Sequence, residues 1–134
     1  MNKIERTYYP DGQIKQEYET INGIKHGKLT LYFKNGRIKI ESNYVQGQPE
    51  GIYKEWYENG QLAEEGENVN GDYFVKNFWD ENGEQLLKDG NGKTIRKFGF
   101  SQGDIYEQYF VNGEFTGEKK IEGVTYGKFI PKGE

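Results

Sequence analysis

The chain repeats itself at a fixed interval of 24 residues. Three aromatic pairs, each followed three residues later by a glycine, keep this interval: Tyr8-Tyr9 with Gly12, Tyr32-Phe33 with Gly36, and Trp56-Tyr57 with Gly60. A second set of glycines has the same spacing: Gly23, Gly47 and Gly71. A fixed period between about 20 and 50 residues indicates stacked supersecondary units, so the chain is predicted to form a repeat array.

The residues inside each repeat alternate between apolar and polar side chains. Ile38 and Ile40 alternate with Lys39 and Glu41, and the segment that begins at Ile14 follows a similar pattern. A period of two residues is typical of β-strands. Each repeat is therefore expected to be a β-hairpin, and about six hairpins account for nearly all of the 134 residues. We predict an all-β fold with almost no helix.

Aspartate-glycine and asparagine-glycine pairs mark the expected hairpin turns: Asp11-Gly12, Asn35-Gly36 and Asn59-Gly60. Both central residues of a type I′ turn have positive φ, which these residue types tolerate, so type I′ turns are predicted at all three sites. Further turns are expected at Gly83, Gly103 and Gly123. The links between hairpins are expected at Gly23, Gly47 and Gly71, and then at Gly92 and Gly113.

The distribution of charge narrows the choice of partners. The net charge is −4, and residues 51–92 alone carry ten acidic against three basic side chains. Nucleic acids and anionic lipids are bound by basic surfaces, so no nucleic acid is expected as a partner. A basic partner is compatible with the acidic middle of the chain. Acidic side chains that only solvate the outside of a polar sheet would give the same pattern.

Membrane and export signals are missing from the sequence. It contains no run of about 18 apolar residues, so membrane insertion is not expected. Residues 1–20 contain no apolar segment of the kind that a secretory signal needs, which favours a cytoplasmic location.

Residues that could support catalysis or bind a metal ion are few. The chain has one histidine and no cysteine, so a nucleophile and base pair would need His26 with Ser42 or Ser101, and none of them lies in a known nucleophile motif. His26 is expected instead to hydrogen-bond the next loop. The segment from Asp89 to Lys93 fails as a calcium loop because its fifth position is a lysine. We expect no enzyme activity, no metal site and no cofactor.

Two segments carry a family resemblance. Residues 22–27, Asn-Gly-Ile-Lys-His-Gly, resemble the N-G-x-x-H-G segment of MORN repeats. Residues 51–66 resemble the bacterial variant of that repeat, with its G-x-Y-K-x-aromatic-Y-x-N-G-x-L-x-x-E-G pattern. The resemblance is close over residues 4–83 and looser from Gly92 onward.

The resemblance implies a fold and a kind of function. The fold is an elongated, single-layer antiparallel meander of hairpins that forms one domain over residues 1–134. Regular 24-residue repeats would fill about residues 4–83, and shorter, degenerate repeats about residues 84–134. The implied function is protein contact, and bacterial relatives are often classed with antitoxins or immunity proteins that neutralise a toxin domain.

Aromatic side chains are expected to form two columns, because neighbouring residues of a strand point to opposite faces. One column would hold Tyr8, Tyr32, Trp56 and Phe78, and the other Tyr9, Phe33, Tyr57 and Trp79. Ring packing between strands explains this pattern as a structural one. A single layer cannot cover both of its faces, however, so one column is expected to stay accessible as an aromatic groove.

We therefore expect a noncatalytic repeat module that binds another protein, with a basic toxin domain as the candidate partner. The candidate contact residues are Tyr9, Phe33, Tyr57 and Trp79 for affinity, and Glu55, Glu64, Glu65 and Glu67 for orientation. The alternative is a carbohydrate or cell-envelope binder whose sugar rings stack on the same side chains. The end strands of an open sheet also offer edges for self-association.

Overall fold

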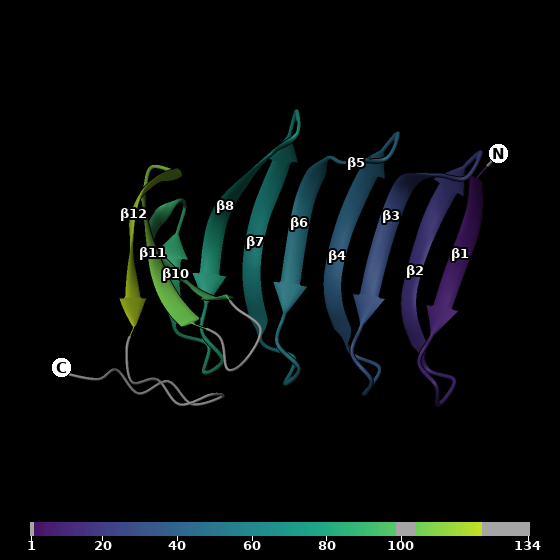
Figure 1. Cartoon of the computed structure of the whole chain (residues 1–134), viewed down its shortest axis with the longest axis horizontal. Helices are drawn as coiled ribbons and strands as arrows, with labels where there is room; N and C mark the ends of the chain where they lie inside the picture. The colour runs from purple at the N-terminus through teal and green to yellow at the C-terminus, as the bar shows by residue number, and fades with distance from the viewer. Residues whose placement is uncertain (1, 99–103, 122–134) are drawn as a thin grey trace.

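The computed structural model describes residues 2–98 and 104–121. They form one open antiparallel sheet of 12 strands, in which strands follow one another in sequence order and β5 pairs only with β4 (Figure 1). The strands are β1 (Asn2–Tyr8), β2 (Ile14–Ile21), β3 (Ile24–Tyr32), β4 (Ile38–Val45), β5 (Gln48–Pro49), β6 (Gly51–Trp56), β7 (Leu62–Val69), β8 (Asp72–Trp79), β9 (Gln85–Lys88), β10 (Asn91–Phe98), β11 (Asp104–Val111) and β12 (Glu114–Ile121). The predicted all-β, single-layer antiparallel meander is confirmed.

The 24-residue period is visible in the strands. β2, β4 and β7 each have eight residues and begin at Ile14, Ile38 and Leu62. The next equivalent strand, β9, begins at Gln85 and has only four residues. The regular pattern therefore ends where β9 is shortened.

The ends of the strands form two edges of the sheet, and one of these edges carries three-residue turns. At the first of them the Gly12 N–H donates to the Tyr9 carbonyl (2.9 Å), and the Tyr9 N–H donates to the Gln13 carbonyl (2.8 Å). Gly12 has a φ of 93°, whereas Asp11 does not have positive φ. This is a type I turn followed by a glycine bulge, and the turns at Gly36, Gly60 and Gly83 have the same hydrogen bonds. The type I′ turns predicted at Asp11-Gly12, Asn35-Gly36 and Asn59-Gly60 are therefore wrong.

The type I′ turns lie at the opposite edge, at the segments predicted as links. Asn22 and Gly23 have φ of 52° and 81° and connect the paired residues Ile21 and Ile24. Equivalent two-residue turns follow at Gln46-Gly47, Asn70-Gly71, Asp89-Gly90 and Asn112-Gly113. The link predicted at Gly92 is thus wrong, because the short β9 brings the turn forward to Asp89-Gly90. The turns predicted at Gly103 and Gly123 lie outside the described residues.

The sheet curls at its C-terminal end. Arg96 in β10 donates from Nη1 to Oε1 of Glu64 in β7, at 2.5 Å. Three strand spacings separate these strands, about 14 Å in a flat sheet, and an arginine side chain cannot cover that distance. The sheet must therefore bend toward the face that carries Glu64 and Arg96, which we call the concave face, and we call the other face convex. Figure 1 shows β10 to β12 crowded together at the left end instead of extending the row of β1 to β8.

A small apolar core sits at this curl. Val75, Phe78 and Leu87 are buried there, and three partly buried side chains pack against them: Leu86, Ile95 and Phe110. Elsewhere in the described part of the chain, buried side chains are mostly polar or small: Thr20, Leu29, Thr30, Ser42, Ala63, Glu64, Asn68, Thr94 and Glu107. Most of the sheet is therefore held together without an apolar core.

Hydrogen bonds from one repeat to the next replace that core. The hydroxyl groups of Tyr9 and Tyr57 donate to backbone carbonyls in the next repeat, each at 2.6 Å. Asn35 and Asn59 donate in the same way to carbonyls one turn further along, at 3.2 Å and 3.1 Å. His26 accepts the N–H of Gln46 at Nδ1 (3.2 Å), which confirms its predicted role at the link. Consecutive hairpins are thus tied together at both edges of the sheet.

The positive φ of the turn glycines predicts a cost for any side chain there. We expect Gly60→Val to lower the free energy of unfolding by more than about 1 kcal/mol, because Gly60 has a φ of 93° and a β-branched residue resists that conformation. Urea unfolding followed by circular dichroism measures the change. Gly117→Val is the matched control, since Gly117 lies in β12 without positive φ and with open space around its Cα. Equal stability of the two variants would contradict the assignment of the turn.

Candidate protein-binding surface

The two tryptophans occupy equivalent positions in their repeats. Asp80 donates its N–H to the Glu84 carbonyl and accepts the Gly83 N–H, and Tyr57 makes the same bonds in its own turn. Trp79 therefore corresponds to Trp56, because each directly precedes this turn residue. The predicted columns, which placed Trp56 and Trp79 on opposite sides, are wrong at the fourth repeat. That repeat is one residue shorter, and its Phe78 is buried in the core opposite Glu64.

The aromatic candidates Tyr9, Phe33 and Tyr57 share one position at the three-residue turns, and all three are half-buried. Lysine ammonium groups lie over two of these rings, at 5.8 Å from the Tyr9 centroid and 5.6 Å from the Phe33 centroid. Burial raises the pKa of Tyr57, and the carboxylates of Glu81 and Asp80 raise it further. The Tyr9 and Tyr57 hydroxyls connect neighbouring repeats, and part of each of the three side chains remains exposed.

The acidic candidates divide between the two faces. Glu55 and Glu64 are opposite one another in the register of β6 and β7 and belong to the concave face. Glu65 and Glu67 belong to the convex face, where they form ion pairs with Lys54 (3.7 Å) and Lys76 (2.9 Å). The structure therefore does not bring the four carboxylates together on one surface.

Glu64 lies at the centre of a buried polar cluster on the concave face. Only 3% of it is exposed, and besides Arg96 it accepts a hydrogen bond from the Tyr73 hydroxyl at 2.7 Å. The Tyr53 hydroxyl donates to Glu55 at 2.9 Å, and the rings of Tyr53 and Tyr73 meet edge to face at 5.3 Å. Glu64 is thus enclosed by its own chain, and its role in this arrangement is structural.

The protonation states of Arg96 and Tyr73 follow from their burial and from the hydrogen bonds and negative charge of Glu64. Burial alone would lower the pKa of Arg96, but the hydrogen bond and the negative charge of Glu64 outweigh it, so the pKa is raised. Burial raises the pKa of Tyr73, and Glu64 raises it further. Arg96 is therefore charged and Tyr73 neutral at physiological pH, and the pair of Arg96 with Glu64 holds β10 against β7.

The sequence contains one signal for this cluster. Gly66 interrupts the alternation of β7, and an isolated glycine in a strand often marks a close approach. In the structure a Cβ on Gly66 would overlap the phenol ring of Tyr73. The glycine therefore allows the ring to lie across β7 and to reach Glu64.

We expect Arg96→Met to lower the free energy of unfolding by about 3 to 5 kcal/mol, because it leaves the Glu64 carboxylate buried without its charged partner. The double variant Arg96→Met/Glu64→Gln should lose clearly less than the sum of the two single variants, since neither charge remains. A double-mutant cycle in urea measures this coupling. Additive losses would show that the two side chains do not interact in solution.

A second enclosed carboxylate, Glu107, holds β10 against β11. It accepts hydrogen bonds from Lys93 and Tyr109, each at 2.6 Å. Burial opposes the charge on Glu107, but the hydrogen bonds from Lys93 and Tyr109 outweigh it and lower its pKa. The hydrogen bond to Glu107 also raises the pKa of Tyr109.

This depressed pKa makes stability depend on acidity. Because the folded pKa of Glu107 lies below its unfolded value, its contribution is complete above the unfolded pKa of about 4.3 and is lost as pH falls through the folded pKa. We expect Glu107→Gln to be less stable than the wild type near pH 7 and to lose less stability on acidification below about pH 4. Melting temperatures across this range measure the effect. Parallel pH profiles for the two proteins would contradict the assignment.

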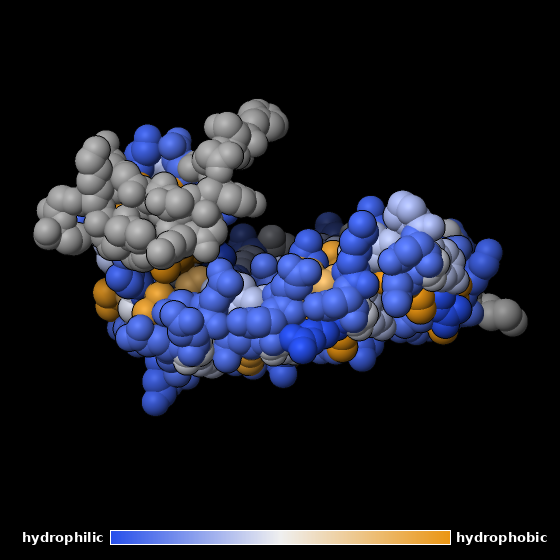
Figure 2. Space-filling view, turned by 90° about the horizontal axis from the view of Figure 1, so that it is seen from below, coloured by the Kyte–Doolittle hydropathy of each residue, from blue (hydrophilic) through white to orange (hydrophobic). Residues whose placement is uncertain are grey.

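The edge with the three-residue turns carries carboxylates of a different kind. Glu58, Glu81 and Glu84 are exposed, and among the described residues no basic side chain forms an ion pair with them. Figure 2 views the molecule from this side and shows a largely hydrophilic surface with separate hydrophobic spots. We call the two turns at Gly60 and Gly83, together with Trp56, Trp79 and Glu84 beside them, the acidic turn edge. It combines free negative charge with the half-buried rings of Tyr57 and Trp79.

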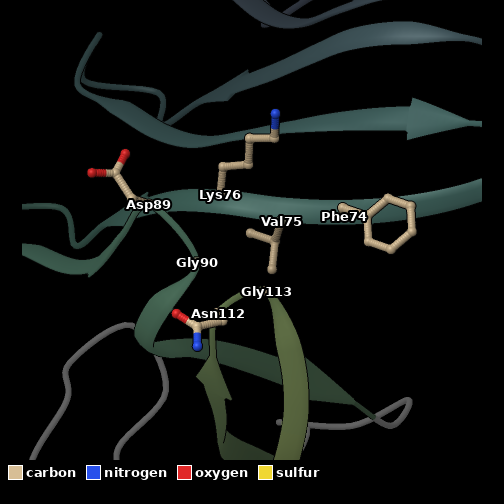
Figure 3. Close-up of a pocket in the computed structure, with 7 residues that line it drawn as sticks. All are labelled: Phe74, Val75, Lys76, Asp89, Gly90, Asn112 and Gly113. Carbon is tan, nitrogen blue, oxygen red and sulfur yellow. The ribbon is translucent and has the colours of Figure 1, made fainter.

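An open depression of about 580 Å³ lies between β8 and two type I′ turns (Figure 3). The turns are linked to β8 and to each other, since the Gly90 N–H donates to the Lys76 carbonyl (2.8 Å) and the Gly113 N–H to the Gly90 carbonyl (2.9 Å). Figure 3 shows the Lys76 side chain pointing away from Asn112, so the polar side chains that line the depression do not converge.

Two further features bear on ligands and membranes. Within the residues that the structure describes, no group of three or more histidine and acidic side chains is placed to hold a metal ion. In the same part of the chain, no helix is long and apolar enough to cross a membrane.

A family model described as the MORN repeat variant matches residues 1–22, 25–46 and 49–69. The chain belongs to the MORN repeat variant family. Each matched MORN segment is one pair of strands joined by a three-residue turn, and the matches are separated by the type I′ turns at Gly23 and Gly47. No curated protein and no solved structure shows significant similarity to the chain. The strands β8 to β12 lie beyond the matched MORN segments and continue the same meander.

Proposed function

We propose that this MORN repeat protein is a noncatalytic module that binds a basic protein through its acidic turn edge. The proposal is carried by one observation: the exposed carboxylates of Glu58, Glu81 and Glu84 have no basic partner among the described residues and lie at the turns beside Tyr57 and Trp79. By contrast, Glu64, Glu65 and Glu67 are paired within the chain. The carboxylates that the fold leaves free are thus the ones available to a partner.

The chemistry of this edge suits a protein interface. Tyrosine and tryptophan are frequent anchors at interfaces, because they bury a large apolar area and keep one polar group. Free carboxylates around such anchors steer a basic partner and accelerate association. Burial is the main cause of the raised pKa of Tyr57, and the nearby carboxylates of Glu81 and Asp80 raise it further.

A toxin domain is the partner class that we propose, and this choice rests on the resemblance to bacterial variant repeats. The carbohydrate alternative is less favoured by the contacts. A sugar that stacks on Tyr57 cannot hydrogen-bond its hydroxyl, because that hydroxyl already donates to the Trp79 carbonyl at 2.6 Å. Protein binding by charge and by ring contact does not require that hydroxyl.

The test begins with affinity capture from the native host and continues with the purified partner. We expect Glu58→Lys/Glu81→Lys to weaken binding about 10-fold to 100-fold, mainly through slower association, and to make the association rate less sensitive to salt. Trp79→Ala should weaken binding by about 2 kcal/mol at a temperature where it stays folded. Surface plasmon resonance at several salt concentrations measures both. Glu114→Lys is the matched control, because Glu114 is an exposed carboxylate in β12, far from this edge.

Two results would overturn the proposal. Unchanged affinity and salt dependence in Glu58→Lys/Glu81→Lys would remove the acidic turn edge as the binding surface. Recovery of a glycan as the bound species, with no protein captured, would favour the carbohydrate-binding alternative.

A further inference from the structure

The strand β1 is an edge of the sheet. It runs from Asn2 to Tyr8, pairs with β2 on one side, and lies at the right-hand end of the sheet in Figure 1. Ile4 in the middle of β1 is 53% exposed. An edge strand of this length presents a row of backbone N–H and C=O groups that a further strand can pair with.

The register shows which residues of β1 present these groups. Ile21 and Ile24 close the two-residue turn between β2 and β3, so the backbone groups of Ile21 point toward β3. In an antiparallel sheet successive residues alternate between their two neighbours, so Thr20 points toward β1 and its partner Lys3 points back toward β2. Ile4, the next residue, therefore points its N–H and C=O away from the sheet, as do Asn2 and Arg6.

The charges of β1 are complementary to a second copy of β1 in one symmetric register. A two-fold axis centred on Lys3, Glu5 or Arg6 places two like charges directly opposite each other, which is unfavourable. An axis centred on Ile4 instead places Lys3 of each copy opposite Glu5 of the other, and it sets the exposed Ile4 side chains against each other. Axes nearer to the ends of β1 pair fewer residues.

We propose that two copies of this protein associate through β1, antiparallel and centred on Ile4, to form one continuous sheet. Ile4 exchanges backbone hydrogen bonds with Ile4 of the second copy, and Asn2 does so with Arg6. Lys3 and Glu5, which now lie 3.6 Å apart within one strand with 74% and 39% of their side chains exposed, form two ion pairs across the new junction. Arg6 keeps its pairing with Glu17 at 2.6 Å.

A charge swap tests the register. In sedimentation equilibrium of the full chain we expect a concentration-dependent dimer. Lys3→Glu and Glu5→Lys should each raise its dissociation constant about tenfold or more, because each single change sets like charges opposite each other. The double variant Lys3→Glu/Glu5→Lys restores opposite charges and should return the constant to near the wild-type value. Glu114→Lys in β12, at the other end of the sheet, is the control and should leave the dimer unchanged.

Cysteine cross-linking tests the geometry directly, since the chain contains no cysteine. In the proposed dimer the two Ile4 Cα atoms are about 5.5 Å apart, within the range that a disulfide spans. Ile4→Cys should therefore form a covalent dimer under mild oxidation. Arg6→Cys should not, because Arg6 lies opposite Asn2 of the second copy.

Three results would overturn the proposal. One is a protein that stays monomeric up to about 1 mM, where even weak association is detectable. Another is a dimer whose dissociation constant is indifferent to Lys3→Glu and to Glu5→Lys, which would place the junction elsewhere. The third is equal cross-linking of Ile4→Cys and Arg6→Cys, which would exclude the register centred on Ile4.

Discussion

The hydrogen bonds between consecutive repeats are the interaction on which the rest of this structure depends. A sheet one layer thick has no second layer to pack against, so each hairpin is stabilised by the hairpins beside it. The hydroxyls of Tyr9 and Tyr57, the side-chain amides of Asn35 and Asn59 at the three-residue turns, and the imidazole of His26 all bond to backbone groups of the following repeat. Residues that the sequence places at turns and links therefore also form the contacts that keep the array in register.

The curl of the sheet marks the end of the regular repeat array. Beyond the last matched MORN segment the short β9 interrupts the regular spacing, and the only apolar cluster among the described residues forms there around Phe78 and Leu87. The ion pair of Glu64 with Arg96 sits on the inside of this bend. Burying a charge is unfavourable unless it is paired, so the bend must bring Arg96 to Glu64. The direction of the curl is thus coupled to one electrostatic contact between β7 and β10.

The sequence predicts the repeated part of this fold well because its information is local. Alternating side chains and glycines at fixed intervals determine the strands and the connections between them. The predicted turn type is wrong because an aspartate-glycine or asparagine-glycine pair fits two kinds of loop. At the first turn, the hydrogen bond from the Tyr9 N–H to the Gln13 carbonyl decides between them. The predicted aromatic columns are wrong at Trp79 because the Phe78-Trp79 pair lies one residue further from its turn glycine, Gly83, than the earlier pairs lie from theirs. The contact of Glu64 with Arg96 spans 32 residues and exists only through the curl, which no local pattern encodes.

The difference between strand positions and turn positions explains where many of the unpaired carboxylates lie. The acidic middle of the chain suggests one negative surface, yet the strand carboxylates Glu64, Glu65 and Glu67 are neutralised by nearby Lys and Arg side chains. A strand residue has neighbours on both sides at about 5 Å, so a carboxylate within the sheet can be paired across strands, as Glu65 is with Lys54 and Glu67 with Lys76. A turn residue has solvent around it and carries charge at little cost to the fold. Glu58, Glu81 and Glu84 are exposed turn residues without an ion pair among the described residues, and such turn side chains can change to suit a partner while the strands that hold the sheet stay the same.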